Sequence, residues 1–113
     1  MTTQIDFSKK KCLPCEGIGR AMTAEEAALS LKSVAGWSLG QDGKSIEHPY
    51  VLKNFIQAVD MINLIKKIAE EEGHHPDLKI SWGSCEIEIW THKVGGLTES
   101  DFILAAKIEN LHV

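Results

Sequence analysis

A long helical pattern that is followed at once by two alternating segments restricts this chain to a small set of folds. Over about residues 54–72, apolar side chains recur at intervals of three and four, which places them on one helix face. Gly73 follows, and glycine readily adopts the left-handed backbone on which helices commonly end. Over 78–82 and 85–92 the apolar period becomes two, which is typical of half-buried strands. The sequence therefore predicts a helix that leads into a strand hairpin.

The part of the chain before residue 54 predicts a second helix and a second hairpin. Thr23 and Glu26 have the spacing of a capping box, so we expect a helix from there to about residue 33. Residues 36–39 and 45–52 indicate two strands that an Asp-Gly turn joins. Each predicted hairpin is thus preceded by a helix.

A third helix is expected at the end of the chain, where Thr98 and Asp101 form another capping-box candidate. The predicted order is helix, two strands, helix, two strands, helix (α-β-β-α-β-β-α). Hairpins with helices between them indicate an α+β domain, a four-stranded antiparallel sheet with about three helices packed on one face. We assign this single domain to residues 23–113 and an irregular N-terminal arm to residues 1–22, which lack clear periodicity.

Composition and charge exclude several classes of function. The 113 residues suffice for one domain, and 12 Lys+Arg against 16 Asp+Glu leave a formal charge of −4, which argues against a general nucleic-acid partner. No apolar run approaches the roughly 20 residues that span a bilayer, and the N-terminus lacks the apolar stretch of a secretory signal. Three cysteines make no disulfide framework, so the expected location is cytoplasmic.

Histidines supply the best candidates for chemistry. His74 and His75 are adjacent and stand directly before Pro76, which biases His75 towards an extended backbone. Adjacent side chains of an extended chain point to opposite sides, so the pair is poorly arranged to bind one metal ion, and we expect no metal. Two alternatives stay open. His74 and His75 are both solvated loop residues, or His92 joins them as a third metal ligand.

His92 is expected close to this pair because of the predicted hairpin. A turn at Gly83-Ser84 puts the end of the second strand beside the start of the first, and His92 follows at that end. Glu70 lies one helical turn before the pair. Imidazoles titrate near neutral pH, so three of them at one end of a sheet favour an acid–base site over a metal site.

Four further residues need an assignment. Trp82 and Trp90 can belong to the core or can stack on a flat ligand, and the alternation favours the core for Trp82. Asp101 is expected to cap the last helix, which does not exclude that it also orients His92. Cys85 is expected inside the core as a small apolar side chain.

The spacing of these residues resembles the signature of the pterin-4a-carbinolamine dehydratase family. The similarity includes a Gly-Gly-Leu-Thr-x-x-Asp segment at 95–101 and extends from about Thr23 to Leu111. The arm also resembles that of many bacterial and plant-organelle members, whereas Leu78 replaces a tryptophan of the animal enzymes. The residues that carry the resemblance are Glu70, His74, His75, Pro76, Trp82, His92 and Asp101.

The resemblance implies a small lyase that needs no cofactor. Its reaction would remove water from 4a-hydroxytetrahydropterin, the product of aromatic amino acid hydroxylases. The product would be quinonoid dihydropterin, which is then reduced, so that the pterin is recycled.

The resemblance also implies a role for each site residue. His74 and His92 would be general acids, one on each face of the pterin, and His75 would bind and orient the ring. Glu70 and Asp101 would hold the histidines. Pro76 and Trp82 would complete the set that binds or orients the substrate.

Self-association is expected on two grounds. A four-stranded open sheet has free edges, and Met61, Leu64 and Ile68 add apolar helix surface beside the main stripe. The resemblance agrees, because family members pair sheets across a dimer and often form tetramers. We therefore expect a homodimer or a homotetramer, together with a functional link to an aromatic amino acid hydroxylase.

Two alternative functions remain at this point. The first is a non-catalytic dimerisation or coactivator protein, because animal relatives also act as dimerisation cofactors for a transcription factor. The second is a family member that acts in another pterin pathway, such as molybdopterin metabolism. The complete histidine set favours the enzyme over the first alternative, and the neighbouring genes would decide between pterin recycling and the second.

Overall fold

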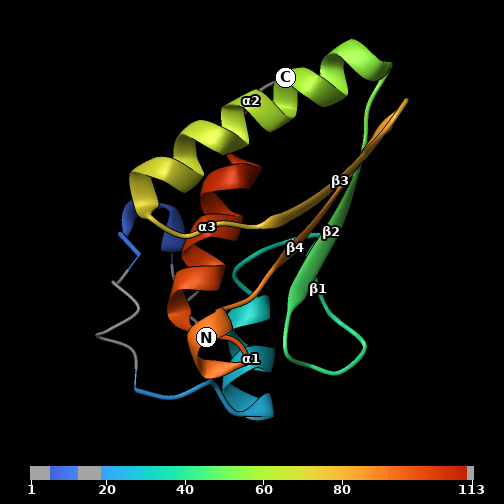
Figure 1. Ribbon diagram of the computed structural model, residues 1–113. Helices are drawn as coiled ribbons and strands as arrows, with labels where there is room; N and C mark the ends of the chain where they lie inside the picture. The colour runs from blue at the N-terminus through green and yellow to red at the C-terminus, as the bar shows by residue number, and fades with distance from the viewer. Residues whose placement is uncertain (1–5, 13–18, 112–113) are drawn as a thin grey trace.

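The computed structural model of the chain describes residues 6–12 and 19–111 and places four strands in one antiparallel sheet (Figure 1). The order across the sheet is β1-β2-β4-β3, so β2 and β4 are central while β1 and β3 form its edges. The strands are β1 (Ser38–Leu39), β2 (Ile46–Val51), β3 (Asp77–Ser81) and β4 (Ser84–Ile89). The predicted four-stranded antiparallel sheet is confirmed.

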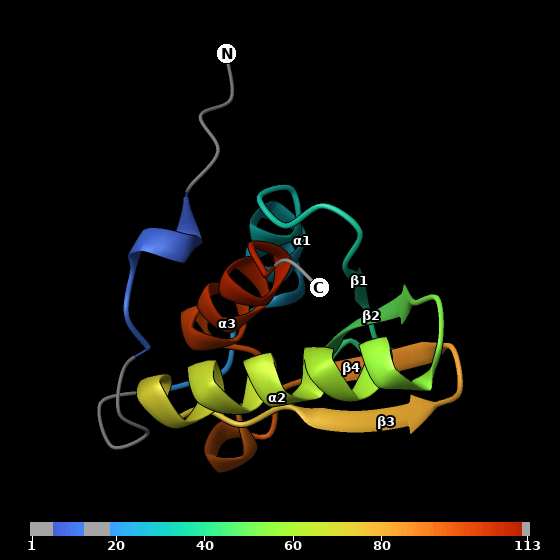
Figure 2. The ribbon, with the colours of Figure 1, turned by 90° about the horizontal axis from the view of Figure 1, so that it is seen from above.

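The helices lie on one face of this sheet, which confirms the predicted α+β class. The long helix α2 contacts β3 and β4 and packs against α3, which in turn contacts α1 (Figure 2). The elements are α1 (Ala24–Leu31), α2 (Phe55–Glu72), α3 (Glu99–Glu109) and two short 3-10 helices, η1 (Phe7–Lys9) and η3 (His92–Val94). In the part of the chain that is described, none of the helices has both the length and the apolar character that a membrane span requires.

Hydrogen-bonded caps fix where the first two long helices begin. Thr23 Oγ1 accepts a hydrogen bond from Glu26 N at 3.2 Å, and Thr23 N donates to Glu26 Oε1 at 2.8 Å, which is the predicted capping box. The side chain of Asn54 accepts from Gln57 N at 2.9 Å and caps α2. Thr23 therefore performs the capping role that its spacing to Glu26 predicted.

The end of α2 determines how the chain enters the histidine pair. Gly73 has a φ of 63°, the left-handed conformation that a side chain would oppose. His74 N donates to Ala69 O at 3.2 Å, which ties the residue after the cap to the last turn of the helix. The backbone at His74 is therefore held by α2 before β3 begins.

The inner face of β4 forms the centre of the core. Cys85, Ile87 and Ile89 are at most 1% exposed, and Thr91 continues the same face just beyond the strand. The helix α3 covers this layer and is itself buried along most of its length. The predicted alternation in β4 is confirmed, and burial raises the pKa of the Cys85 thiol, as suits a residue inside the core.

The buried stripe of α2 includes a residue that was expected to lie beside it. Its buried residues are Ala58, Met61, Ile65 and Ala69. Met61, which was expected to add surface for self-association, is instead part of the core at 2% exposure. Phe55, at the first position of the helix, is half-exposed, because the sheet-facing stripe is centred on Met61 and Ile65.

The core assignment of Trp82 is wrong. Ser81 pairs with Ser84, so Trp82 occupies the two-residue turn between β3 and β4, and its side chain is 70% exposed. Alternation predicts burial only while a strand continues, and here the strand has already ended. Leu78 and Ile80 do share the inner face with β4, but each remains more than one-third exposed because β3 is an edge strand.

The predicted arm is in part attached to the domain. Of residues 1–22, the structure describes 6–12 and 19–22. Phe7 is buried, and its ring packs against Phe102 of α3 with the centroids 5.9 Å apart. Cys12 N donates to Glu72 Oε1 at 2.8 Å. Cys15 lies outside the described residues.

Candidate active site

A pocket of about 180 Å³ lies where α2 ends and β4 ends. Its histidines come from two segments, since His74 and His75 follow α2 while His92 follows β4. The antiparallel pairing of β3 with β4 is what brings these ends together, as the hairpin pattern predicted. The lining residues are Gly73, His74, His75, Trp90, His92 and Lys93.

His74 is held by a buried carboxylate. Its Nε2 lies 2.6 Å from Asp101 Oδ1, and the two side chains are 7% and 0% exposed. The same carboxylate accepts from Thr98 N at 2.8 Å through Oδ2, so it also caps α3 as predicted. Because Asp101 occupies Nε2, the Nδ1 atom of His74 is the ring nitrogen left for a substrate.

Two buried hydroxyls support this carboxylate, and the sequence analysis did not single them out as site residues. Thr91 Oγ1 donates to Asp101 Oδ2 at 2.9 Å and lies 2.8 Å from Thr98 Oγ1. Both threonines are buried. The available signal was the position of Thr91, a polar residue on the inward face of a strand, where a buried hydroxyl needs a partner.

His75 has a carboxylate partner in a different environment. Its Nε2 lies 2.5 Å from Glu70 Oε2, and the two side chains are 61% and 71% exposed. Glu70 is near the end of α2, so the helix presents the carboxylate to His75, the second residue after its Gly73 cap. The resemblance implied that Glu70 and Asp101 hold the histidines, and the structure pairs each with a different one.

His92 stands against an aromatic wall. Its ring lies 3.9 Å from the ring of Trp90, centroid to centroid, with a tilt of 31° between the planes. Trp90 Nε1 donates to Asp77 Oδ2 at 3.2 Å, which ties the indole to the start of β3. Trp90 is therefore a wall of the pocket, whereas Asp101 lies against His74 and not against His92.

The two remaining predicted site residues, Pro76 and Trp82, lie at opposite ends of β3. Pro76 is half-buried and links His75 to the first residue of the strand. Trp82 lies beyond the last residue of β3, so within one chain the strand separates it from the histidines. The single chain therefore does not bring Trp82 to the pocket.

The arrangement favours proton transfer over metal binding. Each of His74 and His75 already shares a nitrogen with a carboxylate. Across residues 6–12 and 19–111, no three His, Cys, Asp or Glu side chains are grouped in a way that could hold a metal ion. Imidazoles that are paired with carboxylates and open to a pocket are suited to give and accept protons.

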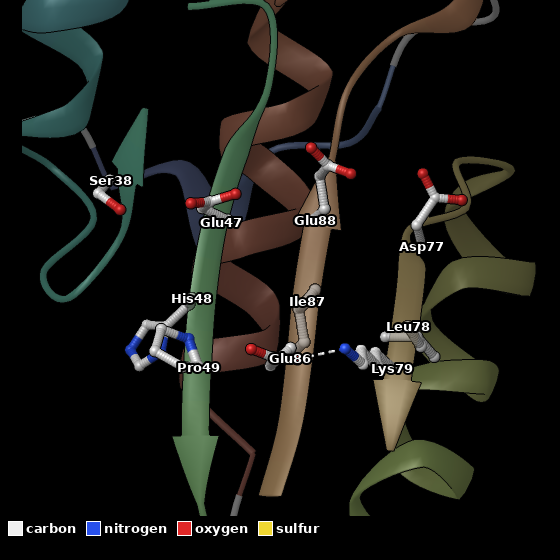
Figure 3. A pocket seen from close by; sticks show the side chains of 10 residues that line it. All are labelled: Ser38, Glu47, His48, Pro49, Asp77, Leu78, Lys79, Glu86, Ile87 and Glu88. Atoms are coloured by element: carbon white, nitrogen blue, oxygen red, sulfur yellow. Dashed lines mark ion pairs between the residues drawn. The ribbon is translucent and has the colours of Figure 1, made fainter. Parts of the chain in front are cut away.

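A larger pocket of about 440 Å³ lies on the open face of the sheet (Figure 3). Carboxylates from three strands stand on this face, namely Glu47, Glu86, Glu88 and Asp77, and Lys79 lies 3.9 Å from Glu86. This larger pocket lacks the three histidines that line the smaller one. We therefore place the candidate active site at the three histidines.

Comparisons with known proteins identify the family of the chain. The sequence profile of the family described as pterin 4 alpha carbinolamine dehydratase matches residues 20–111. An Arabidopsis thaliana protein named pterin-4-alpha-carbinolamine dehydratase 2, mitochondrial, is 48% identical over 96% of this chain and 60% of its own length. A Rickettsia canadensis protein that carries the same family name is 49% identical over 92% of this chain and 95% of its own length.

A solved structure shows the same fold. The crystal structure titled transcriptional coactivator/pterin dehydratase from Brucella melitensis superposes with a TM-score of 0.76. It covers 80% of this chain and 96% of its own, at 24% sequence identity. At that identity the likeness concerns the fold alone.

Proposed function

The chain belongs to the pterin-4a-carbinolamine dehydratase family, and from that premise we propose that its three histidines perform the dehydration by acid–base catalysis. The activity is that of a hydro-lyase, which removes water from a 4a-hydroxytetrahydropterin and leaves quinonoid dihydropterin.

The chemistry of the step matches what the pocket contains. The 4a-hydroxyl is a poor leaving group and needs a proton as it departs. A ring nitrogen supplies the electrons and then loses its own proton. Imidazole can serve both transfers near neutral pH, because its unperturbed pKa is near 6.5.

His74 and His92 are the proposed general acids. They reach the pocket from the segment that follows α2 and from the start of η3, so a flat ring between them would present one face to each. This arrangement would let both 4a epimers react. His75 is the proposed binding and orienting residue, because its exposed pair with Glu70 can adjust to the ring.

The observation that carries the proposal is the buried pair of His74 and Asp101. A fully buried carboxylate with three hydrogen bonds keeps the imidazole in one orientation, which is what a general acid requires. Pro76 is the proposed support of the extended segment at His75. Trp82 is the proposed aromatic contact for the pterin.

Several finer features stay part of the proposal. We infer a homodimer or homotetramer, a functional link to an aromatic amino acid hydroxylase, and a reaction that needs no metal or cofactor. A cytoplasmic location is also inferred. Cys12 and Cys85 are free thiols, as a reducing compartment allows, although the Arabidopsis relative is named as mitochondrial.

A stopped-flow assay tests the proposed function. Freshly generated 4a-hydroxytetrahydropterin is mixed with the protein, and the absorbance of quinonoid dihydropterin is followed against the spontaneous reaction. We expect a rate proportional to protein concentration and well above the spontaneous one. A rate that stays at the spontaneous value at every protein concentration would reject the dehydratase.

A further inference from the structure

His92 lacks the direct support that His74 has. Its side chain is exposed, and within residues 6–12 and 19–111 its ring forms no hydrogen bond and no ion pair. The ring contact of His92 is the stack on Trp90, with 3.9 Å between the centroids. An exposed imidazole without a hydrogen bond changes rotamer readily, whereas a general acid needs its proton within about 3 Å of the departing oxygen. The orientation of His92 therefore depends on Trp90.

The backbone between these two residues places their rings together. Thr91 is extended, with φ −98° and ψ 103°, so the side chains of Trp90 and His92 leave the chain on the same side. Aromatic rings at this separation attract each other in tilted and offset arrangements. Such a stack fixes the imidazole only if the indole is itself fixed.

The register of the sheet places Asp77 where it can hold this indole. Asp77, the first residue of β3, stands opposite Glu88 of β4, and Trp90 follows Glu88 by two residues. Trp90 is therefore the diagonal neighbour of Asp77, a separation that a long aromatic side chain can span. Nε1 is the only hydrogen-bond donor of an indole, and it donates to Asp77 Oδ2 at 3.2 Å. This bond restricts the rotation of the indole.

The neighbouring carboxylates direct Asp77 towards the indole. Glu47 stands opposite Glu88, and Glu88 stands opposite Asp77, so three carboxylates form a row across three strands (Figure 3). Like charges placed directly opposite are destabilising. Ser45 Oγ donates to Glu88 Oε2 at 2.8 Å, and Trp90 donates to Asp77. A movement of Asp77 away from the indole and towards Glu88 would bring like charges closer, which favours the observed hydrogen bond.

We propose that Asp77 and Trp90 are positioning residues for His92, since the carboxylate holds the indole and the indole holds the imidazole at the pocket. The two acids then have carboxylate support of different kinds. Asp101 supports His74 directly and inside the core, whereas Asp77 supports His92 from the surface and through Trp90. The role of His92 as an acid rests on the proposed function, whereas the support of its ring does not.

Nuclear magnetic resonance of histidine ring protons tests the support of His92 without any activity measurement. The spectra are recorded at alkaline pH, where protonation of imidazole does not contribute, and His92→Ala identifies the signals. The indole ring current should shift the His92 signals upfield, and Trp90→Leu should abolish that shift. Asp77→Ala should reduce it, because the released indole moves away from the imidazole. A shift that is unchanged in Asp77→Ala would overturn the positioning role of Asp77.

Conservative variants separate the hydrogen bond from the charge in the same spectra. Asp77→Asn keeps an oxygen that can accept from Nε1, so it should retain most of the shift. Glu47→Gln is the matched control, because it removes a carboxylate from the same row without a contact to Trp90. A loss of shift in Glu47→Gln equal to that in Asp77→Ala would mean that charge in the row, and not the bond to the indole, positions His92.

The two 4a epimers test whether this support matters for the reaction. Asp77→Ala should lower kcat/KM by about 2- to 10-fold for the epimer that His92→Ala slows, as expected for the loss of one hydrogen bond. The epimer that depends on His74 should keep its unsubstituted value. A merely structural role of Asp77 would slow both epimers equally, and that result would overturn the proposal.

A double variant tests whether Asp77 acts through Trp90. Trp90→Phe keeps an aromatic face but has no N–H, so it should slow the same epimer by at least as much as Asp77→Ala. In the Trp90→Phe background, Asp77→Ala should cause no further loss, because both changes remove the same bond. Losses that multiply would mean that Asp77 acts by another route, which overturns the pathway through the indole.

These measurements also distinguish failure of the two proposals. If His92→Ala slows neither epimer, catalysis by His92 is refuted, and the ring-proton shifts still decide whether Asp77 and Trp90 hold the ring. If His92→Ala slows one epimer while Asp77→Ala and Trp90→Phe slow neither, the proposed catalysis stands and the positioning role is refuted.

Discussion

The two histidine–carboxylate pairs of the pocket have nearly the same length and opposite surroundings. His74 lies 2.6 Å from Asp101, and both side chains are buried. His75 lies 2.5 Å from Glu70, and both side chains are exposed. A distance alone therefore does not distinguish a fixed catalytic group from an adaptable one.

The surroundings decide how each pair behaves. Asp101 is held by Thr91 and Thr98, and a buried charge without its partners is costly, so the His74 pair has one stable geometry. Glu70 is held by the solvent-facing end of α2, where water screens the pair and the side chain can move. The buried pair is suited to fix the orientation of a general acid, and the exposed pair is suited to adjust its position to a bound ligand.

Removing both proposed acids should have the largest effect. The His74→Gln, His92→Ala variant should lose about 100- to 10,000-fold in dehydration rate, because a positioned acid or base is worth that much. Stopped-flow absorbance measures the rate. His48→Gln, which changes a histidine outside the pocket, should keep the unsubstituted rate. A double variant with the control's rate would refute catalysis by these histidines.

Neutralising each carboxylate should separate the two pairs by stability. Asp101→Asn should lower the free energy of unfolding by about 2–4 kcal/mol, because it disrupts a buried network of hydrogen bonds to a charge. Glu70→Gln should change it by less than about 1 kcal/mol, as exposed pairs contribute little. Urea titration followed by tryptophan fluorescence gives both values. Equal losses would mean that burial does not distinguish the pairs.

The exposed pair should affect binding more than chemistry. His75→Ala should raise KM by a few-fold and leave kcat closer to the unsubstituted value, because a contact that positions the ring acts in the ground state as well. Steady-state kinetics at several pterin concentrations separate the two constants. A fall in kcat that matches that of His74→Ala would place His75 among the acids instead.

Removal of metal ions should disturb neither histidine–carboxylate pair. Dialysis against EDTA is expected to leave the dehydration rate unchanged, and elemental analysis should find less than one zinc per chain. His74 and His75 each share a nitrogen with a carboxylate, so neither depends on a metal for its orientation. A rate that is lost on chelation and restored by zinc would contradict the proton-transfer account.

Local signals in the sequence predicted most of the fold. The capping boxes at Thr23 and Thr98 predicted two helix starts, and the alternation in β4 predicted which of its residues face the core. Each of these depends on residues close together in the chain. The closeness of His92 to His74 was also predictable, because a hairpin puts the end of its second strand beside the start of its first.

Long-range packing explains what the sequence did not predict. The partner of Asp101 depends on where α3 docks against the end of α2, and no local pattern contains that information. The exposure of β3 depends on the order of strands, since the same alternating pattern is covered in β4 and uncovered at an edge. Trp82 was misassigned because the turn begins one residue earlier than the pattern predicted. The boundary of the domain near residue 23 stays a prediction.

The rates of the two 4a epimers with single histidine variants test the central claim most directly. If His74 and His92 are acids on opposite faces of the ring, His74→Ala should slow mainly one epimer and His92→Ala mainly the other, each by roughly 10- to 1000-fold. Stopped-flow measurements on each separately generated epimer give the four rates. Single variants that both keep the unsubstituted rate with either epimer would contradict the account.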